Sequence, residues 1–107
     1  MKILITGGAG FIGSNIANII SKEKDVAEVV ALDDLSLGLP SNLSQKIKFV
    51  KGSVMNYDLV LELSKGCDYI FHEAALSSSP MFIEDPRRGI DVNVSGFMNV
   101  KGFMLMA

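Results

Sequence analysis

Short apolar runs alternate along this chain with segments in which apolar residues recur every three or four positions. The short runs predict four β-strands, at residues 2–6, 27–32, 46–51 and 67–72. The helical spacing predicts helices at residues 11–24, from 56 or 57 to 65, and from 85 or 86 to near residue 107. Residues 35–45 predict a loop with room for one helical turn. Strands that alternate with helices indicate an α/β fold with a doubly wound parallel sheet.

The first predicted strand runs directly into the glycine-rich segment Thr6-Gly-Gly-Ala-Gly-Phe-Ile-Gly13, which opens the first predicted helix. Glycine at 7, 10 and 13 gives a G-x-x-G-x-x-G spacing. A tight turn needs a residue that tolerates positive φ, and a diphosphate must approach the backbone closely. The free amides of the helix N-terminus favour an anion. The segment therefore predicts a dinucleotide site, whereas the alternative interpretation is a turn that merely reverses the chain.

An acidic residue at the end of the second predicted strand completes this motif. Asp33 follows Val29-Val-Ala-Leu32 and lies 20 residues beyond Gly13 (33 − 13 = 20), the separation typical of a ribose-binding carboxylate. Such a carboxylate would repel a 2′-phosphate, so NAD is favoured over NADP. The alternative is that Asp33 caps a loop. Asp34 either assists it or caps the following turn.

Composition and charge narrow the function classes. The net charge is −2 and the isoelectric point is about 5.2, so there is no basic footprint for nucleic acid or an anionic membrane. No run of 18 apolar residues is present, and glycines interrupt the apolar start. We therefore expect no membrane span, no signal peptide and a cytoplasmic location. There is no repeat or linker, so we expect residues 1–107 to form one domain.

Four stretches of this sequence resemble the extended short-chain dehydrogenase/reductase family, in particular its NAD-dependent nucleotide-sugar epimerases and dehydratases. UDP-glucose 4-epimerases are the nearest branch. These stretches are Ile3–Asn15, Leu32–Gly38, Phe71–Pro80, and Glu84–Arg87 with Asn93–Gly96. The pattern and the resemblance together predict a Rossmann-type fold with strand order 3-2-1-4. The nucleotide would lie across the carboxyl ends of the strands, where the order reverses.

The resemblance implies a role for each matched position, with NAD as the cofactor. Backbone groups would hold the diphosphate, Asp33 would hold the adenosine ribose with Asp34 and Leu35 beside it, and two residues after the third strand would border the adenine. Residues after the fourth strand would run past the nicotinamide, and Asn93 would support that half of the site. The implied positions are Gly7, Gly10, Phe11, Ile12, Gly13, Asp33, Asp34, Leu35, Ser53, Val54, Ala74, Ala75, Leu76 and Asn93.

Two departures from the family pattern change what is expected. The family has an acid after the glycine that follows the third strand, but here Gly52 precedes Ser53, which weakens one adenine contact by about 1 kcal/mol. The family's catalytic base is a tyrosine in a Tyr-x-x-x-Lys pair. Here Leu61 follows Tyr57 by four positions and Glu73 follows Tyr69 by four. From the resemblance we therefore expect this chain to lack the catalytic segment and the sugar-binding domain, and we expect the domain to be incomplete.

We accordingly predict no epimerase activity for this chain by itself and no catalytic residue within it. A nucleotide sugar would bind only if the missing domain were supplied. The alternative function is a non-catalytic dinucleotide-binding or regulatory module. An unstable fragment without a ligand is the third possibility.

For several polar side chains, a purely structural role has to be weighed against a functional one. His72 is the only histidine, so it lacks partners for a metal site and is expected to be structural. Ser77, Ser78 and Ser79 either contact a substrate or form a polar turn. Arg87 and Arg88 lie in the first turn of the last predicted helix, which disfavours cations, so a solvated face is expected.

The last predicted helix carries an apolar stripe, with further apolar residues outside it. Packing on the sheet is the simple explanation for the stripe. In the family, however, the corresponding helix pairs with another subunit, so exposed apolar surface should promote self-association here. The stripe is Ile90, Val94, Phe97, Val100 and Met104, with Met98, Phe103 and Leu105 outside it.

Overall fold

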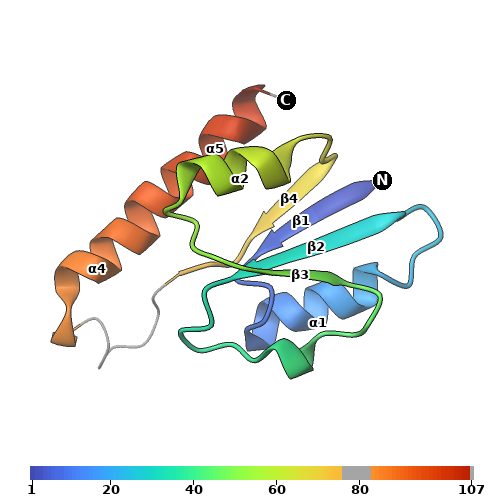
Figure 1. Ribbon diagram of the computed structural model, residues 1–107, viewed down its shortest axis with the longest axis horizontal. Coiled ribbons are helices and arrows are strands. Elements are labelled where there is room, and N and C mark those ends of the chain that lie inside the picture. The colour runs from blue at the N-terminus through green and yellow to red at the C-terminus, as the bar shows by residue number, and fades with distance from the viewer. Residues whose placement is uncertain (76–82, 107) are drawn as a thin grey trace.

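The computed structural model describes residues 1–75 and 83–106, the last five of these as backbone only, and it shows a parallel sheet between helices (Figure 1). The strands are β1 (Lys2–Thr6), β2 (Glu28–Asp33), β3 (Lys48–Lys51) and β4 (Tyr69–His72). The helices are α1 (Phe11–Ile20), α2 (Tyr57–Ser64), α4 (Pro86–Ile90) and α5 (Gly96–Met106). A single turn, η1 (Pro40–Asn42), lies between β2 and β3, and the π-helical segment η2 (Asp91–Ser95) joins α4 to α5.

The four strands are all parallel and lie in the order β3-β2-β1-β4, as the sequence predicted. β1 is central because its five residues are almost entirely apolar and are buried from Ile3 to Thr6. Thr6, the last residue of β1, pairs with Leu32 of β2 and His72 of β4. The carboxyl ends of the three strands therefore meet at one edge, where the order reverses between β1 and β4.

Two apolar clusters cover the two faces of the sheet. On one face, Leu4, Val30 and Leu32 pack with Val60 of α2 and Val100 of α5. On the other face, side chains of β1 and β2 pack with Ala17 of α1 and with Ile47 before β3. Figure 1 shows the resulting three layers, with α1 on one side of the sheet and α2 and α5 on the other. This packing holds the glycine-rich turn between β1 and α1 against the edge of the sheet.

The predicted elements are confirmed in type and order, but several boundaries differ. α1 ends at Ile20 rather than at Lys24, because the exposed residues 22–25 bury nothing that would stabilise another turn. β3 begins at Lys48 and β4 at Tyr69, two residues later than predicted in each case. β2 extends to Asp33, so the predicted ribose-binding acid is the last strand residue.

The apolar stripe predicted along the last helix does not pack on the sheet as a unit. Val100 is 1% exposed, whereas Ile90, Val94 and Phe97 are 55%, 56% and 45% exposed. The helix buries a different face, marked by Gly89, Gly96 and Val100. It also contains a π-helical turn, in which the Gly96 amide donates to the Asp91 carbonyl across five residues instead of four. The side chain of Met104 lies outside the described part of the structure.

No helix in residues 1–75 and 83–106 is long and apolar enough to cross a membrane.

Candidate dinucleotide site

The glycine loop turns sharply at the end of β1. Gly7 has a φ of +65°, and its amide donates to the Leu32 carbonyl at 2.7 Å. A Cβ on Gly7 would lie 2.7 Å from the backbone of Glu73 and Ala74. A Cβ on Gly13 would lie 2.2 Å from the Gly7 carbonyl oxygen. The turn itself and the close packing of α1 on it therefore require glycine at both positions.

Gly10 is different, because none of the residues that the structure describes requires glycine at this position. Its φ of −75° and ψ of 178° are open to any residue. A Cβ there would meet only the Gly7 carbonyl oxygen, at the ordinary contact distance of 3.4 Å. Gly10 is also the N-cap of α1 and leaves the first helical amides without a side-chain cap. A Cβ would thus occupy the space in front of these amides, which is where an anionic group would approach.

Asp33 fixes the middle of the glycine loop to the end of β2. One carboxylate oxygen accepts the Ala9 amide at 2.9 Å, and the other accepts the Leu35 amide at 2.8 Å. The side chain is only 8% exposed. The structure therefore shows the loop-capping role that the sequence left as an alternative. Since a carboxylate has about four acceptor sites, each oxygen keeps capacity for a ligand hydroxyl.

The segment after β2 braces the same loop from outside the site. The Ala9 carbonyl accepts the Leu39 amide at 3.0 Å and the Asn42 side-chain amide at 2.9 Å. Leu35 has a φ of 66°, a conformation that costs a non-glycine residue about 1 kcal/mol. This left-handed residue turns the chain, so that the side chains on either side of it, Asp34 and Ser36, reach the site.

These segments surround a pocket of about 410 Å³ at the carboxyl edge of the sheet. Its lining includes three carboxylates and, among the residues that the structure describes, a single cation, Arg88. The lining residues are Gly7, Gly10, Phe11, Ile12, Gly13, Leu32, Asp33, Asp34, Ser36, Leu37, Gly38, Gly52, Ser53, Val54, Glu73, Ala74, Ala75, Arg88 and Val92.

Arg88 reaches from α4 to the loop after β2. Its Nη2 donates to Ser36 Oγ at 2.9 Å and lies 3.8 Å from Asp34 Oδ2. Ser36 Oγ in turn donates to Asp34 Oδ1 at 2.6 Å. Asp85, the N-cap of α4, accepts the Arg88 amide at 3.1 Å and so fixes where this side chain starts. The expectation of a purely solvated arginine is wrong for Arg88, although its side chain remains 46% exposed.

The end of β4 is tied to β1 by a buried hydroxyl. Thr6 Oγ1 lies 2.6 Å from His72 Nδ1 and accepts the Ala74 amide at 3.2 Å. Burial lowers the pKa of His72 below 6.5, and the carboxylate of Glu73 opposes this in part. A neutral ring accepts the Thr6 hydroxyl proton at Nδ1. Through the Thr6 hydroxyl, His72 thus helps to position the Ala74 backbone at the pocket. Residues 1–75 and 83–106 contain no cluster of three or more His, Cys, Asp or Glu side chains that could hold a metal ion.

The wall next to β3 is formed by Ser53 and Val54. Ser53 Oγ accepts the Met55 amide at 3.1 Å, and the Val54 side chain is 4% exposed. The Val54 carbonyl accepts the Asn99 side-chain amide at 3.0 Å, which ties this wall to α5. A hydroxyl that is already engaged locally stands where the sequence resemblance implied a carboxylate.

The structure brings most of the predicted site residues to one pocket. Leu35 and Asn93 do not line it, and Leu76 lies outside the described residues, as do Ser77, Ser78 and Ser79. Sequence reasoning missed several lining residues, among them Arg88 and Val92. Neither residue belongs to a recognised sequence motif. Each reaches the pocket only because of where α4 and η2 lie in the fold. The predicted residues that line the pocket are Gly7, Gly10, Phe11, Ile12, Gly13, Asp33, Asp34, Ser53, Val54, Ala74 and Ala75.

Comparisons with known proteins identify the family to which this chain is similar. The model of the NAD dependent epimerase/dehydratase family matches residues 3–105. A putative UDP-glucose 4-epimerase of Methanocaldococcus jannaschii is 34% identical over 103 residues, which is 95% of this chain and 33% of that protein. UDP-glucuronic acid decarboxylase 6 of Arabidopsis thaliana is 34% identical over 95% of this chain and 29% of its own length. The chain therefore spans about a third of the length of these relatives.

Solved structures give the same result. The UDP-glucose 4-epimerase of Thermotoga maritima, determined with UDP-glucose, superposes with a TM-score of 0.89 at 30% identity. The match covers 96% of this chain and 33% of that one. The UDP-glucose 4-epimerase of Thermus thermophilus, in complex with NAD, gives a TM-score of 0.84 at 30% identity, over 96% of this chain and 33% of its own.

Proposed function

Because the chain belongs to the NAD dependent epimerase/dehydratase family, we propose that its pocket binds NAD and that residues 1–107 are the NAD-binding part of a nucleotide-sugar epimerase or dehydratase. Three of the four similar proteins named above are UDP-glucose 4-epimerases, one of them putative. NAD, when bound, supplies the hydride acceptor for sugar oxidation. The residues of this chain supply binding and orientation.

Gly10 is the observation that carries this proposal. Conformation and packing account for Gly7 and Gly13, but neither accounts for Gly10, whose Cβ would point into open pocket space. The absence of a side chain there makes sense if a ligand lies against the backbone. The uncapped amides at the start of α1 then face that ligand, which favours a diphosphate.

Asp33 supports the choice of NAD. Its carboxylate lines the pocket while holding the amides of Ala9 and Leu35. The acceptor capacity that remains suits a ribose diol. A 2′-phosphate in the same place would face the negative charges of both Asp33 and Asp34, so NAD is favoured over NADP.

The other predicted positions keep the roles that the family pattern implies. In the proposal, Phe11 and Ile12 contribute amides beside Gly13, and Ser53 and Val54 border the adenine. Asp34 and Leu35 flank the ribose. The nicotinamide half is assigned to Ala74, Ala75, Leu76 and Asn93.

The 107-residue chain by itself is proposed to lack epimerase activity. Neither Tyr57 nor Tyr69 is followed four positions later by lysine, so no base of the family type is available. General acid–base catalysis contributes roughly 10²–10⁴-fold, and orientation of the substrate can supply about 7–11 kcal/mol. Purified chain should therefore leave UDP-glucose and UDP-galactose unconverted, and sustained interconversion would contradict this part of the proposal.

Self-association is proposed for the helical face that begins in α4. Ile90, Val94, Phe97 and Met98 are between 45% and 59% exposed, and together they form an apolar surface that favours a second copy of the chain.

Calorimetric titration tests the NAD assignment. Wild type should bind NAD more tightly than NADP, and Gly10→Val should lower NAD affinity by more than about tenfold. The fold should survive this change, because valine tolerates the backbone angles at position 10 and its Cβ clears the Gly7 carbonyl oxygen. A far-ultraviolet circular dichroism spectrum like that of wild type checks this. Equal affinity of the folded variant and wild type would remove the main support for the proposal.

A further inference from the structure

We propose that Arg88 is a positioning residue that retains the dinucleotide by bridging two walls of the pocket, from α4 to Ser36 in the loop after β2. This inference rests on the proposed function, and it assigns to Arg88 a role that the glycine motif and its acidic partner do not include. The bridge consists of the Arg88 guanidinium, the Ser36 hydroxyl and the Asp34 carboxylate.

The geometry of the bridge is continuous. Arg88 Nη2 donates to Ser36 Oγ at 2.9 Å, and Ser36 Oγ donates to Asp34 Oδ1 at 2.6 Å. All three residues line the pocket. The two ends come from segments that are 52 residues apart in the sequence. The contact therefore spans from one wall to the other, and a ligand between these walls leaves more easily when it opens.

The charges around the pocket also indicate that Arg88 contacts an anionic ligand. Arg88 is the one cation among the described lining residues, against the carboxylates of Asp33, Asp34 and Glu73. A dinucleotide brings two further negative charges. The guanidinium has five N–H donors, of which Ser36 takes one, so donors remain for an anion in the pocket.

The exposure of the pair fits a contact that opens and closes. The side chains of Arg88 and Asp34 are 46% and 36% exposed, and their closest charged atoms are 3.8 Å apart. Ion pairs in contact with water are weak, so the bridge does not prevent entry. When a bound anion also accepts from the guanidinium, Arg88 is held in place, so the closed bridge should slow departure more than entry.

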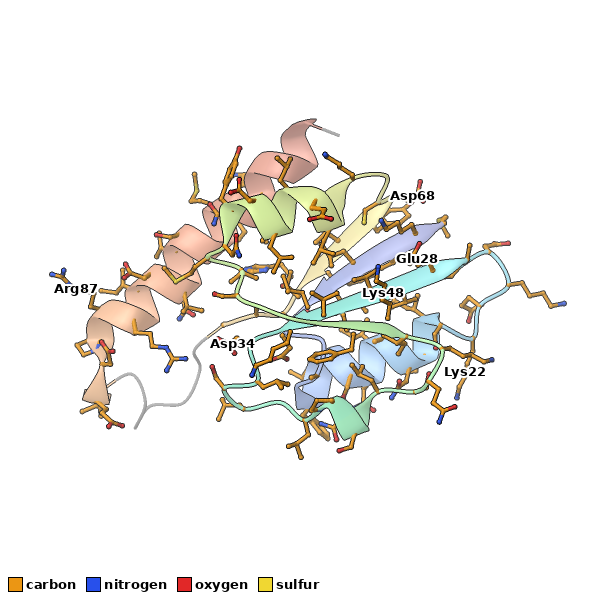
Figure 2. All side chains as sticks on the ribbon, viewed as in Figure 1. Lys22, Glu28, Asp34, Lys48, Asp68 and Arg87 are labelled. Carbon is orange, nitrogen blue, oxygen red and sulfur yellow. The ribbon has the colours of Figure 1, made fainter. Side chains whose placement is uncertain are left out.

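Arg87 provides a matched control for this arginine. It is the sequence neighbour of Arg88 and has the same charge, but it does not line the pocket. Figure 2 shows the Arg87 side chain pointing from α4 away from the sheet and from the labelled Asp34. Arg87→Gln and Arg88→Gln therefore make the same change in net charge, and only the second removes the bridge.

The test measures release and association of NADH by stopped-flow fluorescence, with excess NAD as the competitor for release. Arg88→Gln and Ser36→Ala should each raise the dissociation rate constant about fivefold and leave the association rate constant within about twofold. The double variant should be no faster than the faster single variant, because both changes break one bridge. Arg87→Gln should behave as wild type. Ser36→Ala keeps every charge, so its effect isolates the hydrogen bond.

Three outcomes would overturn the inference. Release from Arg88→Gln at the wild-type rate would show that no bridge retains the ligand. A lower association rate constant for Arg88→Gln, with wild-type rate constants for Ser36→Ala, would show that the arginine acts only by long-range attraction of the ligand. Failure of wild type to bind NADH would end the proposed function and this inference together, which separates that failure from the first two.

Discussion

Ala9, in the middle of the glycine loop, donates its amide to Asp33 and accepts from Leu39 and Asn42 at its carbonyl. On the opposite wall of the same pocket, the described contacts of the Arg88 guanidinium are a hydrogen bond to Ser36 and a 3.8 Å ion pair with Asp34. The first set of contacts engages both backbone polar groups of one residue and is at least partly buried. The second lies in contact with water.

This difference separates two tasks of one site. A loop that grips a diphosphate through backbone amides has to be in place before the ligand arrives, because binding energy spent on ordering it is lost. A wall that admits and then retains the ligand has to move. Helix α4 has only five residues and continues into the π-helical η2 instead of a regular helix, so the more weakly held wall also has the less regular backbone.

The largest difference in stability should come from adding one methyl group to the glycine loop and one to the wall near α5. Gly13→Ala places its Cβ 2.2 Å from the Gly7 carbonyl oxygen, whereas Gly96→Ala meets a methyl group of Val54 at 2.5 Å. Gly7 is fixed at positive φ, so its backbone cannot yield, while a side chain can shift. We expect Gly13→Ala to lower the free energy of unfolding by about 3 kcal/mol and Gly96→Ala by about 1 kcal/mol or less.

Urea denaturation of both variants measures these losses. Each change adds alanine within or beside a helix, so the gain in helix propensity is similar and largely cancels in the comparison. Similar losses in the two variants would mean that the glycine loop adjusts as readily as the wall near α5.

The two neighbouring carboxylates give the next largest contrast. Both oxygens of Asp33 accept backbone amides in a side chain that is 8% exposed. Asp33→Asn must therefore turn an amide N–H toward a backbone N–H, at a cost of about 2 kcal/mol. In Asp34→Asn the remaining oxygen can still accept from Ser36, so only the exposed ion pair with Arg88 is lost, for about 0.5 kcal/mol or less.

Chemical denaturation of the two isosteric variants at one pH tests this difference. A loss for Asp34→Asn as large as that for Asp33→Asn would show that the wall after β2 depends on its outer carboxylate. A loss of under about 0.5 kcal/mol for Asp33→Asn would instead show that Asp33 does not fix the glycine loop.

The same contrast explains what the sequence could predict. Gly7, Gly10, Gly13 and Asp33 follow from local spacing, because a turn between a strand and a helix and the end of the next strand set their positions. The strand order also followed, because alternating strands and helices indicate a parallel sheet and the family resemblance implied the order 3-2-1-4. These features belong to the rigid wall.

The opposite wall could not be read in the same way. Arg88 contacts Ser36 across 52 residues, and no local pattern encodes where α4 lies relative to that loop. Helical periodicity also assumed a regular α-helix through residues 91–95, whereas the π-helical turn changes the phase there. Val92 lines the pocket, while Ile90 and Val94 are exposed.

Lowering the pH should loosen the junction of β1 and β4 by a smaller amount. Burial depresses the pKa of His72 below 6.5, so the unfolded chain binds the proton more readily than the folded chain. The contribution of His72 to stability is therefore full above about pH 6.5 and is lost as the pH falls toward its folded pKa. The protonated ring would also leave the buried Thr6 hydroxyl without its acceptor.

We expect His72 to account for a loss of under about 1 kcal/mol between about pH 7.5 and pH 5.5, because water screens the partly exposed ring. Urea denaturation across this range measures the loss in wild type and in His72→Gln, which does not titrate. Identical slopes for the two proteins would remove His72 from the pH dependence. A shallower slope for His72→Gln is the expected result.

Replacing the exposed isoleucine of α4 should change the free energy of unfolding least and self-association most. Ile90 is 55% exposed, and Ile19, on α1 at the opposite face of the sheet, is 63% exposed. Either isoleucine changed to Asn should alter the free energy of unfolding by only about 0.5 kcal/mol, as for other surface substitutions. Sedimentation equilibrium should show weaker self-association for Ile90→Asn and unchanged self-association for Ile19→Asn, because only Ile90 lies beside Val94 and Phe97 on one apolar surface. A monomeric wild type at high concentration, or equal weakening in both variants, would show that this surface does not bind a second copy.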